Sequence, residues 1–206
     1  VTENRQNSQP IATDRKASMT PTFAQFYSSK YDESPIPTCS TLQLSEIFTI
    51  GKQKFFLTDD ILFENAGRSL CETIINNILG SFRISYKNHN EPPIVLGLIG
   101  NNRAGCVTLS AMRQLVTRGL KTVVFLLYEK DQSEDDLLPD IDLGLKRISA
   151  AGGKLVGNLV QLKELLGSAD SPLEFILDGL QGFDADINDL VEYDLNRAEE
   201  LVRWCN

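Results

Sequence analysis

Two loops of this chain carry side chains whose chemistry suits ligand binding. Gly100, Asn101, Asn102 and Arg103 follow a short apolar run, and Asp178 follows a second one. An asparagine amide both donates and accepts hydrogen bonds, the amides at a helix start attract anions, and arginine can pair with a phosphate. A carboxylate at a strand end suits acid–base chemistry or cation binding. The two loops together form the candidate ligand site.

Each of these residues also has a purely structural interpretation. Asn101 and Asn102 can close a tight turn and cap the next helix, while Asp178 can bond its own backbone amides. Arg103 can simply lie on the surface. An ion pair between Arg103 and Asp178, or a loop folded over Asp178, would close the site. An open cavity holding Asp178 beside Asn102 would leave it ready for a ligand.

The two loops belong to a region that alternates between strand and helix patterns. Strands are expected at 94–99, 122–128, 154–156 and 174–177, and helices at 108–118, about 137–151, 159–166 and 186–205. Apolar strands alternating with helices predict a parallel sheet covered on both faces. We therefore predict an α/β chain with a three-layer αβα, Rossmann-like fold and a mostly parallel sheet. Ligands bind such folds at the edge where the strands end.

The polar first segment, 1–36, lacks apolar periodicity and is expected to be a linker or tail. The domain is expected over 37–206 and to be incomplete at its C-terminal end. A first helix should start near Ser40, and its expected apolar positions include Leu42, Ile47 and Ile50.

A second helix is predicted with Thr58 as its N-cap and Gly80 as its stop. Its expected buried stripe is spaced by four residues: Leu62, Ala66, Leu70, Ile74 and Ile78. Gly67 weakens this helix by about 1 kcal/mol relative to alanine, so close packing against a neighbouring loop is expected there.

Composition narrows the functional classes. The net charge is −8, so a generic nucleic-acid binder is not expected and any RNA contact needs a local basic patch. The single histidine, His89, argues against a metal site or a histidine-based triad. The four cysteines lack a C-x-x-C spacing and are expected to be buried free thiols in a reducing compartment. Without an apolar run of about 18 residues, no membrane contact is expected, and the predicted location is cytoplasmic.

Three motifs, in order, resemble the YjeF N-terminal domain family. They are Leu-Phe-Glu-Asn-Ala-Gly-Arg at 62–68, Gly-Asn-Asn at 100–102 and Leu-Asp-Gly-Leu at 177–180, and the resemblance covers roughly 37–206. Family enzymes are epimerases of hydrated NAD(P)H. The resemblance implies that Asn102 and Asp178 would face K⁺ and the phosphate, and that Asp178 would be the catalytic residue.

The chain departs from the enzyme pattern in both loops. The acidic residue and second glycine pair of the first loop are missing, Arg103 replaces a glycine, and the Gly-Thr-Gly after the aspartate is lost. Losing these glycines removes the close backbone approach that catalysis needs. We therefore expect no catalytic residue, no resident cofactor and no metal, and at most a nucleotide-like ligand at the two loops.

One branch of the family, found in activators of mRNA decapping, shows this kind of loss of catalytic loop residues. The Glu-Asn-Ala-Gly-Arg helix at 64–68 and the Pro-Ile-Pro-Thr-Cys entry at 35–39 fit that branch. The resemblance implies a non-catalytic scaffold domain that forms a homodimer, in part through its first two helices, and promotes messenger-ribonucleoprotein granules. It further implies decapping-complex and P-body partners, weak RNA binding and a cytoplasmic location. The alternative is a working NAD(P)H-hydrate epimerase.

Overall fold

The computed structural model describes residues 38–85, 87–128, 136–183 and 192–206. The residues from Thr41 to Asn206 belong to one structural unit. The expected tail at 1–36 lies outside the described residues, as do positions 186–191 of the last predicted helix. The linker and domain boundary therefore stay predictions.

Four parallel strands form the sheet, in the order β3-β2-β1-β4. They are β1 (Ile94–Gly100), β2 (Lys121–Leu127), β3 (Lys154–Val156) and β4 (Leu173–Gly179). All of β1 is buried, because it lies between β2 and β4 and is covered on both faces. The apolar runs of the sequence thus correctly marked the strands.

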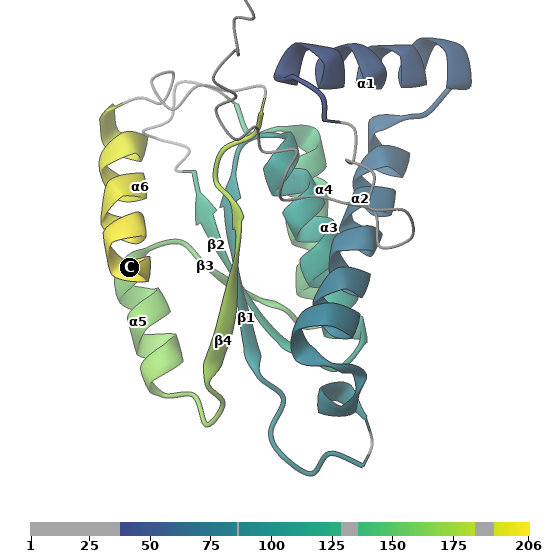
Figure 1. The fold of residues 1–206 in the computed structure, drawn as a ribbon. Coiled ribbons are helices and arrows are strands. Elements are labelled where there is room, and N and C mark those ends of the chain that lie inside the picture. The colour runs from purple at the N-terminus through teal and green to yellow at the C-terminus, as the bar shows by residue number, and fades with distance from the viewer. Residues whose placement is uncertain (1–37, 86, 129–135, 184–191) are drawn as a thin grey trace, which may run out of the picture. The chain divides into compact units, whose positions relative to one another are not determined.

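Helices cover both faces of the sheet (Figure 1). One face carries α3 (Arg103–Thr117) and α4 (Pro139–Ala151), with α2 (Asp59–Thr73) packed against α3. The other carries α5 (Leu159–Gly167) and α6 (Glu192–Cys205). Each face has its own buried apolar cluster, around Ile99 and Leu109 on the first and around Leu96 and Leu201 on the second. The predicted three-layer αβα fold with a parallel sheet is confirmed.

The second helix begins as predicted, but its buried stripe is displaced by one residue. The Ile61 N–H donates to the Thr58 hydroxyl oxygen over 3.4 Å, which caps α2. The residues buried in α2 are Phe63, Gly67 and Cys71, whereas Ala66 is exposed. The expected stripe was therefore wrong for most of its length, because the bare backbone at Gly67 brings that side of the helix onto α3.

Gly67 explains this approach directly. A Cβ atom at Gly67 would lie 2.6 Å from the Ser110 side chain and 2.8 Å from the Ala111 nitrogen. The predicted close packing at Gly67 is therefore confirmed. Gly67 packs against the helix α3, however, and not against a loop. Beyond α2 the helix continues as a π-helical turn (Ile74–Leu79). This turn ends at Gly80, where φ is 79°.

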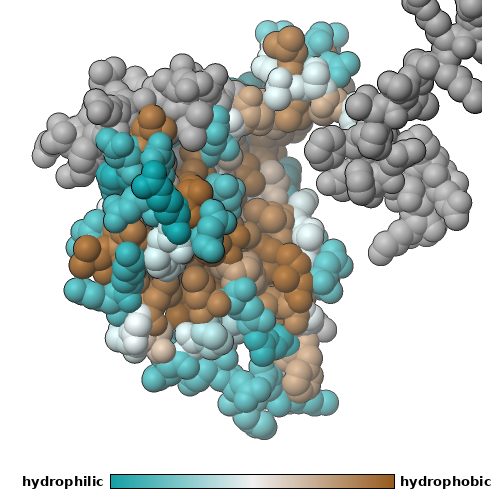
Figure 2. Space-filling view, turned by 60° about the vertical axis from the view of Figure 1, so that its left-hand side comes forward, coloured by the Kyte–Doolittle hydropathy of each residue, from teal (hydrophilic) through white to brown (hydrophobic). Residues whose placement is uncertain are grey.

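The first helix, α1 (Thr41–Phe55), contributes no buried residue. Leu42, Ile47 and Phe55 are 82%, 58% and 69% exposed, and Phe56 just beyond the helix is 83% exposed. Leu42 and Ile47, two of the expected apolar positions, thus face solvent. Figure 2 shows apolar side chains open on α1 at the top of the view, beside hydrophilic ones.

Candidate functional site

The two candidate loops meet at one edge of the sheet, as the strand pattern predicted. β1 and β4 are hydrogen-bonded neighbours, with Leu98 opposite Asp178 and Ile99 opposite Gly179. We call 100–103 the first edge loop and 178–183 the second edge loop. Because both strands run in the same direction, both loops leave the sheet at its carboxyl edge.

Asn102 uses both atoms of its amide inside the protein. Its Oδ1 accepts from the Gly105 N–H over 3.0 Å, which caps α3, and its Nδ2 donates to the Leu180 carbonyl over 2.7 Å. This cap starts α3 at Arg103, five residues before the predicted start. Asn102 therefore caps the helix, as its structural interpretation predicted. Its amide also joins the two edge loops.

Asn101 makes a corresponding pair of contacts on the other side. Its Nδ2 donates to the Asp136 carbonyl over 3.0 Å, and its Oδ1 accepts from the Leu138 N–H over 2.8 Å. These bonds fix the segment that leads into α4. The two asparagines thus hold three segments of main chain together at the carboxyl edge.

Gly100 is required for this arrangement. A Cβ atom there would lie 2.0 Å from the Leu180 carbonyl oxygen, and one at Gly105 would lie 2.2 Å from the Gly100 oxygen. Backbone therefore occupies the space that a bound ligand would need beside Gly100. The second edge loop is folded onto the first.

Asp178 faces the opposite side of the sheet from α3. Its Oδ1 accepts from the Leu180 N–H over 3.0 Å, as expected of an aspartate that organises a turn. Its side chain is exposed and lines a cavity of about 420 Å³. The other lining residues come mainly from the second edge loop and α6: Leu127, Leu180, Gln181, Ala198, Glu199, Val202 and Arg203.

Asn102 is not among the residues that line this cavity. Burial, and secondarily the nearby Asp178 carboxylate, raises the pKa of the Cys205 thiol on α6. Asp178 therefore lies close to α6.

Arg103 makes a contact that the sequence did not indicate. Its guanidinium lies over the Phe48 ring of α1, 5.9 Å from the ring centroid. Phe48 in turn stacks on Phe183 of the second edge loop, with centroids 5.7 Å apart and an interplanar angle of 11°. Of the ion pairs between described residues, none joins Arg103 to Asp178. The Arg103–Asp178 pair that would close the site is therefore not formed, and the second edge loop folds onto Gly100 while Asp178 stays exposed.

The residues at the edge do not fit the K⁺ ion that the family resemblance implies. The Asn102 oxygen is committed to the cap of α3, and the Asp178 carboxylate lies in another cavity. In the part of the chain that the structure describes, no group of three or more His, Cys, Asp or Glu side chains could hold a metal ion.

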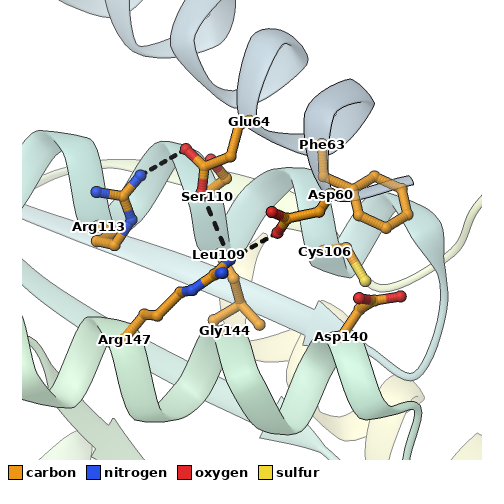
Figure 3. A pocket seen from close by; sticks show the side chains of 10 residues that line it. All are labelled: Asp60, Phe63, Glu64, Cys106, Leu109, Ser110, Arg113, Asp140, Gly144 and Arg147. Atoms are coloured by element: carbon orange, nitrogen blue, oxygen red, sulfur yellow. Dashed lines mark hydrogen bonds and ion pairs between the residues drawn. The ribbon is translucent and has the colours of Figure 1, made fainter. Parts of the chain in front are cut away.

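The Glu-Asn-Ala-Gly-Arg motif has a packing role at the junction of α2, α3 and α4 (Figure 3). The Arg113 guanidinium contacts the Glu64 carboxylate at 2.5 Å, and Arg147 contacts Asp60 at 2.8 Å and Glu64 at 3.8 Å. These side chains surround a cavity of only about 20 Å³. Ion pairs between arginines of α3 and α4 and acidic residues of α2 therefore hold these three helices together.

Cys106 lies at the other end of this small cavity, beside Phe63 and Asp140 (Figure 3). Burial, reinforced by the negative charges of Asp140 and Asp59, raises the pKa of its thiol to about 12. Such a thiol stays protonated at neutral pH and is a poor nucleophile. All four cysteines are free, as expected, although Cys39 is exposed.

No helix among the described residues is both long and apolar enough to cross a membrane.

Comparison with solved structures supports the fold. The yeast protein ynu0, YNL200c, superposes with a TM-score of 0.64 at 18% sequence identity, over 82% of this chain and 65% of that one. At this level of identity the likeness concerns the fold alone.

Curated relatives match over most of the chain. Enhancer of mRNA-decapping protein 3 from Saccharomyces cerevisiae is 26% identical over 184 residues, 86% of this chain and 33% of its own length. The protein of the same name from Schizosaccharomyces pombe is 29% identical over 164 residues, 80% of this chain and 32% of its own length. The chain thus spans about a third of the length of these relatives.

The family model described as "YjeF-related protein N-terminus" matches residues 59–206. This match takes in α2 with its Glu-Asn-Ala-Gly-Arg motif and both edge loops, which carried the resemblance in the sequence. The chain belongs to the family of YjeF-related protein N-terminal domains.

Proposed function

We propose that this chain is a non-catalytic self-association domain of an mRNA-decapping activator. The observation that carries the proposal is the set of large apolar side chains exposed on α1 and just beyond it: Leu42, Ile47, Phe55 and Phe56. A helix with large apolar side chains and no buried residue gains little from packing on its own chain, so it gains from docking elsewhere.

A second copy of the chain is the occupant that we propose for this surface. In a two-fold symmetric pair the same patch serves on both sides, so one exposed apolar helix suffices for both halves of the interface. Ile61 of α2, 43% exposed, is a further exposed apolar side chain close in sequence to α1. The first two helices would thus form the contact.

Phe56 gives this proposal independent support. Its φ is 56°, in the left-handed region where a residue with a Cβ atom costs about 1–2 kcal/mol. Glycine would relieve that cost, yet the position carries a large and exposed aromatic ring. An intermolecular contact made by that ring would offset the strain.

Several observations support the absence of catalysis. The Asn102 amide is consumed by main-chain groups, the Leu180 carbonyl fills the space beside Gly100, and Asp178 faces away from both. An epimerase would need placed groups around a bound substrate. The matched relatives are named as decapping enhancers, so we propose that the domain acts with decapping-complex proteins in cytoplasmic P-bodies.

We also propose that the carboxyl edge binds RNA or a nucleotide-like ligand weakly. Arg103 and the aromatic ring of Phe183 are the groups that support this. The net charge of −8 should keep the affinity low, and a contact between Arg103 and a phosphate should make it fall as salt rises. Binding that is unchanged between low and moderate salt would contradict a phosphate contribution.

Sedimentation velocity at micromolar concentration tests the self-association. We expect a dimer for the unmodified chain, and about thirtyfold weaker association for Ile47→Asp, the effect of losing an apolar anchor worth about 2 kcal/mol. Val160→Asp is the matched control, since Val160 is a 65% exposed apolar residue on α5. A strict monomer with native secondary structure, or equal weakening by both variants, would contradict the proposal.

A cellular measurement tests the proposed role. In the full-length protein, Ile47→Asp should reduce the number of P-bodies while Val160→Asp should not. If both variants support normal granules at equal protein level, self-association through α1 is not what builds them.

A further inference from the structure

The arm formed by α1 reaches the carboxyl edge through one aromatic side chain. Phe48 is half-buried, whereas its neighbours Ile47 and Thr49 are exposed. It is the residue of α1 that stacks on Phe183 and lies beneath the Arg103 guanidinium. α1 therefore contacts both edge loops through the Phe48 ring.

The junction behind α1 contains a backbone residue in a strained conformation. Phe56 adopts the left-handed conformation at φ 56°, and the following Leu57 N–H donates to the Gly51 carbonyl over 3.2 Å. Lys52 adds a partly buried ion pair with Asp59 across the junction, at 2.6 Å. Hinges are short element-terminal segments that absorb a change in φ and ψ, and a strained residue at such a point loses its strain when the segment moves.

The groups that hold Phe48 are those that proteins use to hold a nucleobase. Unstacked bases are bound by aromatic rings and by arginine guanidinium planes, and this binding tolerates any base because each has a π face. Phe183 and Arg103 come from different edge loops. The hydrogen bond from Asn102 to the Leu180 carbonyl joins these loops and so brings the aromatic ring and the cation to the same place. The Phe48 ring of the same chain lies against Phe183 and Arg103, where a base could stack.

We propose that Phe48 is an internal plug: its ring occupies a stacking position for a nucleobase, so that docked α1 and a base-containing ligand exclude each other at the carboxyl edge. This rests on the proposed binding of RNA or a nucleotide-like ligand. Both kinds of ligand share the base. The same exclusion makes release of α1, the arm proposed for self-association, responsive to that ligand.

Hydrogen exchange tests the plug without any ligand. Phe48→Ala should speed amide exchange in 41–55 by about threefold to tenfold, the factor expected from one aromatic contact, and leave the sheet unchanged. Gln53→Ala is the matched control, since Gln53 is an exposed residue of the same helix. Phe48→Leu, which keeps apolar bulk without a stacking ring, should lie between. Equal exchange in Phe48→Ala and Gln53→Ala overturns the plug.

Binding measurements test the exclusion and identify the source of the base. Adenosine 5′-monophosphate and a short oligoadenylate serve as probes, followed by NMR shifts and fluorescence anisotropy. We expect Phe48→Ala to bind one of them about threefold to tenfold more tightly than the unmodified chain, and Phe183→Ala to bind neither. Tightening for the oligonucleotide alone identifies RNA, and equal tightening for both identifies the free nucleotide.

The results separate this inference from the proposed function. Unchanged affinity in Phe48→Ala, or no binding by that variant, overturns the plug even when sedimentation shows a normal dimer. A monomeric chain whose α1 exchange and ligand affinity both respond to Phe48→Ala supports the plug and contradicts the self-association role.

Discussion

At the scale of single residues, the asparagines of the first edge loop serve the main chain of this protein. Asn102 caps α3 and holds the Leu180 carbonyl, and Asn101 fixes the segment before α4. A ligand would have to compete with these bonds, which are already satisfied in a partly buried position. The asparagine pair at this place therefore has a role in folding.

Substitution of Asn102 separates its two bonds. Asn102→Ala should lower the free energy of unfolding by about 1–2 kcal/mol, because the α3 cap and the partner of the Leu180 carbonyl are both lost. Asn102→Ser keeps a cap acceptor and loses the donor to the Leu180 carbonyl, so its cost should be smaller. Urea unfolding followed by circular dichroism measures both. An equal cost for the two variants would show that the cap contributes little.

At the scale of helices, the approach of α2 to α3 depends on one missing side chain. Gly67→Ala should destabilise the protein by about 1–3 kcal/mol, because its Cβ would lie 2.8 Å from the Ala111 backbone nitrogen. Helix propensity alone favours alanine over glycine by about 1 kcal/mol. Gly51→Ala in α1 is the control, since its Cβ would meet only the Leu57 side chain at 3.6 Å, and thermal unfolding should show it slightly stabilised.

The same scale shows what the sequence could predict. Apolar runs located the four strands, and Thr58 and Gly80 bounded the second helix, because these signals are local. The buried face of α2 was misplaced by one position, since Gly67 has no apolar side chain to mark it. The stacking of Phe48 on Phe183 joins residues far apart in the chain, and no local pattern records such a contact.

At the scale of the molecule, the buried thiol of Cys106 links stability to pH. Its pKa is about 12 in the folded protein and near the ordinary 9.0 in the unfolded chain. As pH rises through this interval the unfolded chain releases the proton first, so the free energy of unfolding should fall between about pH 9 and 12. Comparison with Cys106→Ala, which should lose less stability over that interval, isolates the thiol from other alkaline titrations. Parallel pH profiles would contradict this.

The parallel pairing of β1 has a kinetic consequence. Ile94 pairs with Lys121 one crossover away and with Leu173 much further along the chain. Closing the longer connection costs more chain entropy, so β4 should join the sheet after β1 and β2 have paired. The bond from Asn102 to Leu180 then forms only once the barrier has been crossed. In stopped-flow experiments Asn102→Ser should speed unfolding and leave the refolding rate nearly unchanged, so the carboxyl edge governs how long the folded state lasts.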